Sequence, residues 1–286
     1  MQYVVNGISL AAVYALAAVG ISLVFGLTGI VNFAHGEFIV VGAYMTYEVG
    51  HRGGALFIPA LFASIATVTT LSLLVERLLF RRTLRRPIVG FVVSLGLILV
   101  VHNVVVALWD TGPRYVRPLV DGRLSVGSVS LATQRIVVVA IGVAVFALLY
   151  ALLRWTAFGL RLRAVASDRE TAGLVGINVP AMVSGTFLLG GALAGVGGSL
   201  LATLFPVTPS LGSNLVMKAF AVALIGGLGS VSGGVMAACL LGLSEALIVG
   251  YGPSRWVDVI TFAIMLAVLL VRPQGIVRGA AGSSVQ

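Results

Sequence analysis

Asn32, His35 and Glu37 fall within six positions of one another, with Gly36 between the last two, in a strongly apolar part of the chain. Amide, imidazole and carboxylate groups are costly to place in hydrocarbon, and inside a membrane they mark solute or proton pathways. One interpretation is therefore that these residues line a pathway. The other is that the three polar side chains hydrogen-bond one another and only fix a turn.

The composition is that of a membrane protein. The chain has 286 residues, of which 59% are hydrophobic and 9% charged, and its mean hydropathy is +1.12. A soluble domain needs far more surface charge, and a β-barrel would alternate apolar and polar residues in short segments. We predict an all-α polytopic membrane protein that forms a single transmembrane domain over residues 1–286. The net charge of +9 lies in loops, which indicates topology and contact with the lipid bilayer and not nucleic acid.

The long apolar runs predict about eight transmembrane helices, some of them broken by glycine or re-entrant. One run, Ala219–Val249, is too short for two crossings and too long for one, so we expect two half-helices broken at "GGLGSVSGG". The other expected spans are Ile8–Leu27, Phe33–Val49, Ala55–Leu79, Val89–Trp109, Ile136–Leu153, Ala181–Phe205 and Val257–Val271.

Arginines set the expected orientation. The loop Arg77–Pro87, the segment 154–180 and the C-terminal tail with Arg272 and Arg278 are arginine-rich, so we expect them in the cytoplasm. The N-terminus and the loop of residues 110–135 are then outside. The turns at "GLTGIVNFAHG" and "GLGSVSGG" contain no Lys or Arg, so we expect both to stop short of the cytoplasm and to face each other. Because each interrupts a pair of spans, they also suggest an internal repeat.

The outer loop contains the turn signal Asp121-Gly122 and apolar residues at Val126, Val129 and Leu131. This pattern fits a small surface hairpin, although an irregular capped loop would fit as well.

A short cytoplasmic helix is specified in the segment 154–180. Ser167 is a candidate N-cap, and Glu170 completes a capping box with it. Asp168 and Glu170 sit near the positive end of the helix dipole, and Gly176 supplies a left-handed stop. Two helical turns are not stable alone in water, so another surface must pack on them.

Three stretches resemble one family. "RLRAVASDRETAGLVGINV" is similar to the cytoplasmic coupling loop of ABC importer permeases, and in particular of high-affinity branched-chain amino acid permeases of the LivH type. "NGISLAAVYALAAVGISLVFGLTGIVNFAHGEFIVVGAY" and "GGLGSVSGGVMAACLLGLSE" resemble the same permeases. Permeases for urea and short-chain amides share this scaffold.

The resemblance implies a transport subunit of the bacterial inner membrane that works with a second, homologous permease, two cytoplasmic ATPases and an extracytoplasmic binding protein. The chain has no phosphate-binding loop with a lysine, so we expect it to bind no cofactor and to use ATP only through its partners. The resemblance places the ATPase coupling site at Ser167, Asp168, Glu170, Ala172 and Gly176, with Ala172 as the small contact residue.

The resemblance also gives the first stretch a substrate. A branched-chain amino acid is a zwitterion with an apolar tail. A helix N-terminus near Phe33 would attract its carboxylate and Glu37 its ammonium group, so we predict a substrate path at Asn32, His35, Gly36 and Glu37.

The other classes of function have less support. An ion-coupled secondary transporter would need embedded carboxylates or a histidine relay, for which His35 and Glu37 are the candidates. No motif of a catalytic or metal site is present, so we expect no enzyme. Arg255 and Asp258 are expected to pair with each other, and His102 and Asn103 to hydrogen-bond across helices. Small residues recur on one face at Gly191, Gly195, Gly198 and Ala202 and at Gly234, Ala238 and Gly242, where we expect close helix packing.

Overall fold

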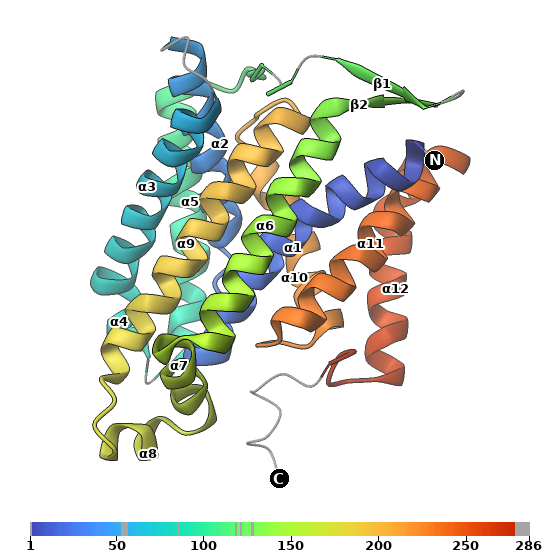
Figure 1. Cartoon of the computed structure of the whole chain (residues 1–286). Helices are drawn as coiled ribbons and strands as arrows, with labels where there is room; N and C mark the ends of the chain where they lie inside the picture. The colour runs from blue at the N-terminus through green and yellow to red at the C-terminus, as the bar shows by residue number, and fades with distance from the viewer. Residues whose placement is uncertain are drawn as a thin grey trace.

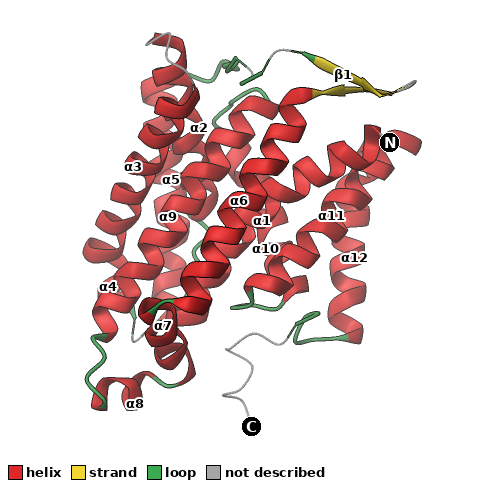
Figure 2. Cartoon of the chain, viewed as in Figure 1, coloured by secondary structure: helices red, strands yellow, loops and turns green. Residues whose placement is uncertain are grey.

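The computed structural model describes residues 2–52, 57–84, 86–117, 119–120, 122–126 and 129–277. These residues are almost entirely helical, with one pair of short strands at one end (Figure 2). Six helices are long and apolar enough to cross a membrane, and two shorter helices are apolar as well. The prediction of an all-α polytopic membrane protein is confirmed.

The first half of the chain contains α1 (Gln2–Thr28), α2 (His35–Arg52), α3 (Phe57–Val75), the π-helical turn η1 (Glu76–Phe80), α4 (Arg81–Thr83) and α5 (Pro87–Trp109). The second half contains β1 (Arg123–Val126), β2 (Val129–Ala132), α6 (Thr133–Trp155), α7 (Ala157–Ser167), α8 (Arg169–Leu174), α9 (Val179–Leu204), α10 (Leu211–Gly226), α11 (Val231–Tyr251), the 3-10 turn η2 (Ser254–Trp256) and α12 (Val257–Val271).

The arginine-rich segments lie together. Figure 1 shows α4, α7, α8 and the last turn of α12 at one end of the molecule, and the N-terminus and the strands at the other. We call the first of these the arginine end. Because arginines are retained on the cytoplasmic side, this arrangement supports an arginine end in the cytoplasm. Arg85 and Arg278 lie outside the described residues.

The outer loop forms the hairpin. β1 and β2 pair antiparallel, with Val126 opposite Val129. Positions 127 and 128, between the two strands in the sequence, lie outside the described residues. The turn signal at Asp121-Gly122 predicted the wrong position, because Gly122 precedes β1; Asp121 is not described.

The run Ala219–Val249 breaks where the sequence predicts. Gly227 and Gly229 have positive φ values of 95° and 86°, which glycine adopts readily. The prediction of two short half-helices is wrong for α11, whose 21 residues are long enough to cross a membrane. The sequence pattern also missed that α10 begins earlier, at Leu211.

Glycines let the central helices approach one another, as predicted. On α9, a Cβ added to Gly195 would lie 2.7 Å from the Cα of Ile65 on α3, and one added to Gly198 would overlap the carbonyl oxygen of Ile39 on α2. On α11, a Cβ at Gly242 would lie 2.6 Å from the carbonyl oxygen of Gly7 on α1. Because lipid gives no hydrophobic drive for helices to associate, such close contacts supply the packing energy.

The close approach of α9 to α2 predicts that one methyl group added at Gly198 destabilises the protein. Gly198→Ala should lower the free energy of unfolding by about 1–3 kcal/mol, because neither backbone can retreat without losing other contacts. The matched control is Gly96→Ala, in the interior of α5, where an added Cβ meets nothing within 4 Å. Thermal unfolding of both purified variants in detergent measures the difference. Equal melting temperatures would contradict the packing assigned to α2 and α9.

Candidate functional site

Residues 29–34 form the turn between α1 and α2. Gly29 turns the chain with a positive φ of 68°. The Oδ1 atom of Asn32 accepts a hydrogen bond from the backbone N–H of Ala34 at 3.1 Å, just before α2 begins. Asn32 is 2% exposed, so this bond satisfies a buried donor at the start of the helix.

This turn lies inside the protein and not at its surface. The N–H of Phe33 donates to Ser94 Oγ at 3.3 Å, and a Cβ on Gly90 would lie 2.8 Å from the side chain of Ile30. Gly90 and Ser94 belong to the first two turns of α5, which places the residue 29–34 turn roughly 5–10 Å inward from the start of α5. This agrees with the expectation that the turn stops short of the cytoplasm.

The second turn, residues 227–230, meets the first helix. A Cβ on Gly26, near the end of α1, would lie 3.1 Å from the Cα of Gly229. The segment after α12 covers this turn from the arginine end, where the N–H of Ile276 donates to the carbonyl oxygen of Ile225 at 2.8 Å. The second break thus lies against the end of α1, just before the first break begins. The expectation that the two turns face each other stays a prediction.

His35 points toward α1 and α9. It is 2% exposed, and a Cβ on Gly20 of α1 would lie 2.5 Å from its Nε2 atom, so only glycine leaves room for the ring. Gly190 of α9 lies on the other side, with its added Cβ 3.9 Å from Cε1. The Nε2 atom has no hydrogen-bond partner among the described residues, which is an unusual cost for a buried polar atom.

Glu37 points toward α10 instead. It is 1% exposed, and a Cβ on Gly212 would lie 2.9 Å from its Oε1 atom. Its Oε2 atom has no hydrogen-bond partner in the described parts of the chain. Gly36 allows this approach, because a Cβ there would overlap the carbonyl oxygen of Gly212.

The structure therefore brings the predicted path residues to one turn but not to one cluster. Asn32 bonds its own turn, His35 faces α1 and α9, and Glu37 faces α10. The alternative that the three side chains hydrogen-bond one another is wrong, because none of the described hydrogen bonds joins two of these side chains. Only the backbones meet, where the N–H of His35 donates to the carbonyl oxygen of Asn32 at 3.3 Å. All three are 2% exposed or less, so a solute reaches them only after helices separate.

Sequence reasoning missed a charged cluster near the other end. Lys218 of α10 forms ion pairs with Glu245 of α11 at 3.0 Å and with Asp258 of α12 at 3.2 Å. The second oxygen of Glu245 accepts a hydrogen bond from the hydroxyl of Tyr14 on α1 at 2.8 Å, and Thr261 Oγ1 donates to its first oxygen at 3.0 Å. Glu245 is 3% exposed, so its charge depends on these partners.

Two expected pairings are wrong. Asp258 pairs with Lys218 and not with Arg255, because the helix begins between the two and turns Asp258 toward α10. Asn103 Nδ2 donates to the carbonyl oxygen of Leu99 in its own helix and not to another helix. The available signal for the cluster was that the chain's single lysine lies within an apolar helix.

The short helix α8 projects at the arginine end (Figure 1). Its N-cap is Asp168 and not Ser167, which is the last residue of α7, so the predicted capping box with Glu170 is not formed. Asp168 Oδ1 accepts from the N–H groups of Glu170 at 2.9 Å and Thr171 at 3.3 Å. The Thr171 hydroxyl and these N–H groups hold the pKa of the Asp168 carboxyl below its usual value.

The predicted left-handed stop of α8 is confirmed. Gly176 has a φ of 84°, and its N–H donates to the carbonyl oxygen of Gly173 at 3.1 Å. The next N–H, of Ile177, donates to the carbonyl oxygen of Ala172 at 3.1 Å. These two bonds form a Schellman motif, which closes the helix after six residues.

The residues exposed on α8 are not the ones that the sequence predicts. Ala172 is buried against its own chain, with 4% exposed, so it is not free to contact a partner. Leu174 and Val175, in contrast, are 88% and 72% exposed. The outer face of α8 is therefore a small apolar tip.

A buried carboxylate fixes the helix that follows α8. Glu76 is fully buried and accepts hydrogen bonds from Ser184 Oγ of α9 at 2.8 Å and from Arg81 Nε of α4 at 3.2 Å. Because a buried charge is stable only when paired, this contact holds α4 and the first turns of α9 together.

Comparisons with known proteins match nearly the whole chain to one family. Residues 3–269 match the family model described as branched-chain amino acid transport system / permease component. The chain is 32% identical to the high-affinity branched-chain amino acid transport system permease protein LivH of Escherichia coli K12, covering 96% of this chain and 94% of that protein.

Two further relatives are similar over most of their length. The permease protein BraD of Pseudomonas aeruginosa is 30% identical, over 96% of this chain and 95% of that protein. The probable branched-chain amino acid transport permease protein LivH of Methanocaldococcus jannaschii is 30% identical, over 91% and 87%. No solved structure matches the chain significantly.

The charged cluster predicts a non-additive pair of substitutions. Lys218→Met should cost about 3–5 kcal/mol of stability, because Glu245 stays buried without its cation. The double variant Lys218→Met/Glu245→Gln should regain much of that loss, since it removes both charges. Unfolding of the single and double variants in detergent measures the coupling. If the change in unfolding free energy of the double variant equals the sum of the changes in Lys218→Met and Glu245→Gln, the pair does not interact as described.

Proposed function

Because the chain belongs to the branched-chain amino acid transport permease family, we propose that it is the transmembrane permease subunit of an ATP-driven importer of branched-chain amino acids. The subunit is a multi-pass protein of the bacterial inner membrane and is not itself an enzyme. The similarity to LivH and BraD over almost the full length of all three chains carries this proposal.

The partners of the proposed importer are a second, homologous permease, two cytoplasmic ATPases and an extracytoplasmic binding protein. The apolar tip of α8 supports an ATPase at the arginine end. Leu174 and Val175 project from a helix that is fixed at both ends, by Asp168 and by Gly176. An exposed, rigid apolar tip loses little entropy when it enters a groove, so it suits docking to a partner. ATP is then bound and hydrolysed by the ATPases, and this chain binds no cofactor.

The docking surface we propose therefore differs from that expected from sequence. Leu174 and Val175 make the contact, while Ala172 seats α8 on its own protomer. Asp168 and Gly176 set the two ends of the helix, Glu170 lies on its exposed side, and Ser167 belongs to the preceding helix.

For the substrate path we retain the stretch Asn32–Glu37, with roles that follow from the contacts. Glu37 lies between α2 and α10 with one oxygen free of hydrogen bonds, and His35 lies between α1 and α9 with one nitrogen free. Both atoms become available when those helix pairs separate. Glu37 would then attract the ammonium group of the amino acid, while Asn32 and Gly36 preserve the turn that holds it.

Two alternatives are distinguished by substrate and by energy source. Uptake of urea or short-chain amides would use the same scaffold, but the names of the similar proteins favour branched-chain amino acids. An ion-coupled secondary transporter would not need the rigid apolar tip of α8.

The energy source of uptake distinguishes an ATP-driven importer from an ion-coupled secondary transporter. In cells that produce all proposed subunits, uptake of radiolabelled leucine should stop when ATP is depleted and persist when the proton gradient is collapsed. Excess isoleucine and valine should compete, and urea and acetamide should not. Uptake that survives ATP depletion but not loss of the gradient would overturn the importer assignment.

The apolar tip predicts an uncoupled variant. Leu174→Asp should reduce uptake by about tenfold or more, because a charge replaces a desolvated contact, and membrane abundance should not change. The control is Tyr115→Asp, which alters an exposed side chain (69%) on the opposite end of the molecule. Normal co-purification of the ATPase with Leu174→Asp, together with normal uptake, would contradict the docking role.

Glu37 predicts a transport defect without a folding defect. Glu37→Gln keeps the size of the side chain and should lower uptake about tenfold, the effect of losing one charge-assisted contact. Asn103→Ala, on the exposed side of α5, is the control. Uptake is normalised to the amount of permease in the membrane. If the normalised uptake of Glu37→Gln equals that of the wild type, the residue is structural and the path lies elsewhere.

A further inference from the structure

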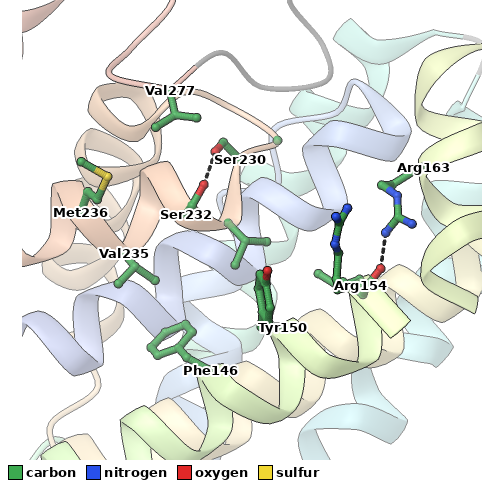
Figure 3. Close-up of a pocket in the computed structure, with 12 residues that line it drawn as sticks. Phe146, Tyr150, Arg154, Arg163, Ser230, Ser232, Val235, Met236 and Val277 are labelled. Carbon is green, nitrogen blue, oxygen red and sulfur yellow. Dashed lines mark hydrogen bonds between the residues drawn. The ribbon is translucent and has the colours of Figure 1, made fainter. Parts of the chain in front are cut away.

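A cavity opens at the arginine end between two parts of the chain that are far apart in sequence. It has a volume of about 650 Å³ and lies between the end of α6 with Arg163 of α7 on one side and the turn 227–230 with the start of α11 on the other (Figure 3). Val277, in the segment after α12, also lines it. A smaller cavity of about 220 Å³ adjoins it and shares Leu153, Arg163, Gly229 and Val231 with it. We call the larger one the α6–α11 cleft.

The polar side of the α6–α11 cleft is positive. Arg154 and Arg163 line it, and its described lining residues include no Asp or Glu. Arg163 donates one hydrogen bond to the carbonyl oxygen of Leu153, which orients its guanidinium beside Arg154 (Figure 3). Arg154 forms no ion pair or hydrogen bond with any residue that the structure describes. Both arginines line the same cleft, so an anion held there would be stabilised by two positive charges.

The opposite wall adds hydrogen-bond donors. Ser230 and Ser232 line the cleft from the start of α11, a helix of 21 residues, and their hydroxyls lie 3.4 Å apart. Ser230 Oγ accepts from Gly233 N at 3.1 Å, and the two serine hydroxyls share one hydrogen bond in which either can be the donor. One of the two O–H groups therefore stays available as a donor to a ligand. This wall therefore complements a phosphate group more closely than a carboxylate, because a phosphate presents oxygens on several sides.

The remaining walls of the cleft are apolar. Phe146, Val235 and Met236 line the cleft away from the arginines. Tyr150 and Met236 are 59% and 53% exposed at its rim. Tyr150 also packs edge-on against Trp155 with 6.2 Å between ring centroids, and such aromatic pairs mark the level of the membrane interface. A ligand of this cleft thus has an anionic head at the interface and an apolar body deeper in the membrane.

We propose that the α6–α11 cleft binds an anionic phospholipid of the cytoplasmic leaflet, with the phosphate between Arg154, Arg163 and Ser230 and an acyl chain along Phe146 and Met236. Basic pockets between transmembrane helices on the cytoplasmic side suit such headgroups. This lipid site depends on the orientation of the chain in the membrane and does not depend on which substrate is transported. A lipid held there contacts α7, which continues into α8, and the turn 227–230, which meets α1. It would therefore bridge the α7–α8 segment, which carries the apolar tip, and the turn 227–230 between α10 and α11.

The test uses full-length permease in detergent, titrated with phosphatidylglycerol and, separately, with phosphatidylcholine, while native mass spectrometry counts bound lipid. Wild type should bind phosphatidylglycerol more tightly than phosphatidylcholine. Arg154→Gln should weaken phosphatidylglycerol binding about fivefold, the effect of one arginine near a membrane anion. Met236→Trp, which fills the apolar wall without altering charge, should weaken binding of the same lipid. Arg161→Gln is the matched control, because it removes an exposed arginine from α7 that does not line the cleft.

Several results would overturn the proposal. Equal loss in Arg161→Gln and Arg154→Gln would mean a general charge effect, and an unchanged Met236→Trp would mean that no chain enters the cleft. Displacement of the lipid by excess inorganic phosphate would assign the site to a soluble anion. Binding that appears only after residues 278–286 are deleted would mean that the tail of the chain is the natural occupant. Equal thermal stability of all three variants ensures that a loss of lipid is not a loss of fold.

Discussion

Backbone polar groups cannot be left unpaired in hydrocarbon, and this constraint governs the two breaks in the helical bundle. Each break leaves N–H and C=O groups without helical partners, so each packs against other segments. The residue 29–34 turn packs against α5, and the turn 227–230 packs against α1 and the segment after α12. Glycine makes this packing feasible, because Gly26 lets α1 meet the turn at Gly229, and Gly36 lets α2 meet α10. The same close approaches enclose His35 and Glu37. Their unpaired atoms are unfavourable while the surrounding helices stay packed. Separation of the helices during transport would relieve this cost, because it lets these atoms find a hydrogen-bond partner.

Features that depend on a single segment, or on summed properties such as apolar length and charge, could be predicted from the sequence. Apolar length predicts the long spans, and arginine content predicts which segments share one end. The end of α8 at Gly176 follows from a single residue that tolerates positive φ. The close packing at Gly195 and Gly198 follows from the spacing of small residues along one helix face.

Features that depend on a partner from another helix could not be predicted in this way. Asp258 lies three residues from Arg255, yet Lys218 of α10 is nearer in space and better shielded. Either Ser167 or Asp168 fits the capping pattern, and the choice depends on where α7 ends. The inward direction of Ala172 depends on how α8 sits against the bundle. The hairpin turn was misplaced because strand pairing, and not a dipeptide, sets its register.

The central claim is that energy from ATP enters this subunit through the apolar tip of α8. Site-specific cross-linking tests it most directly, with one cysteine at position 174 or at position 115 of the full complex in a Cys239→Ala background. The account predicts a cross-linked product between the permease and the ATPase subunit from position 174 and none from position 115. Absence of that product from position 174, or the same product from position 115, would contradict it.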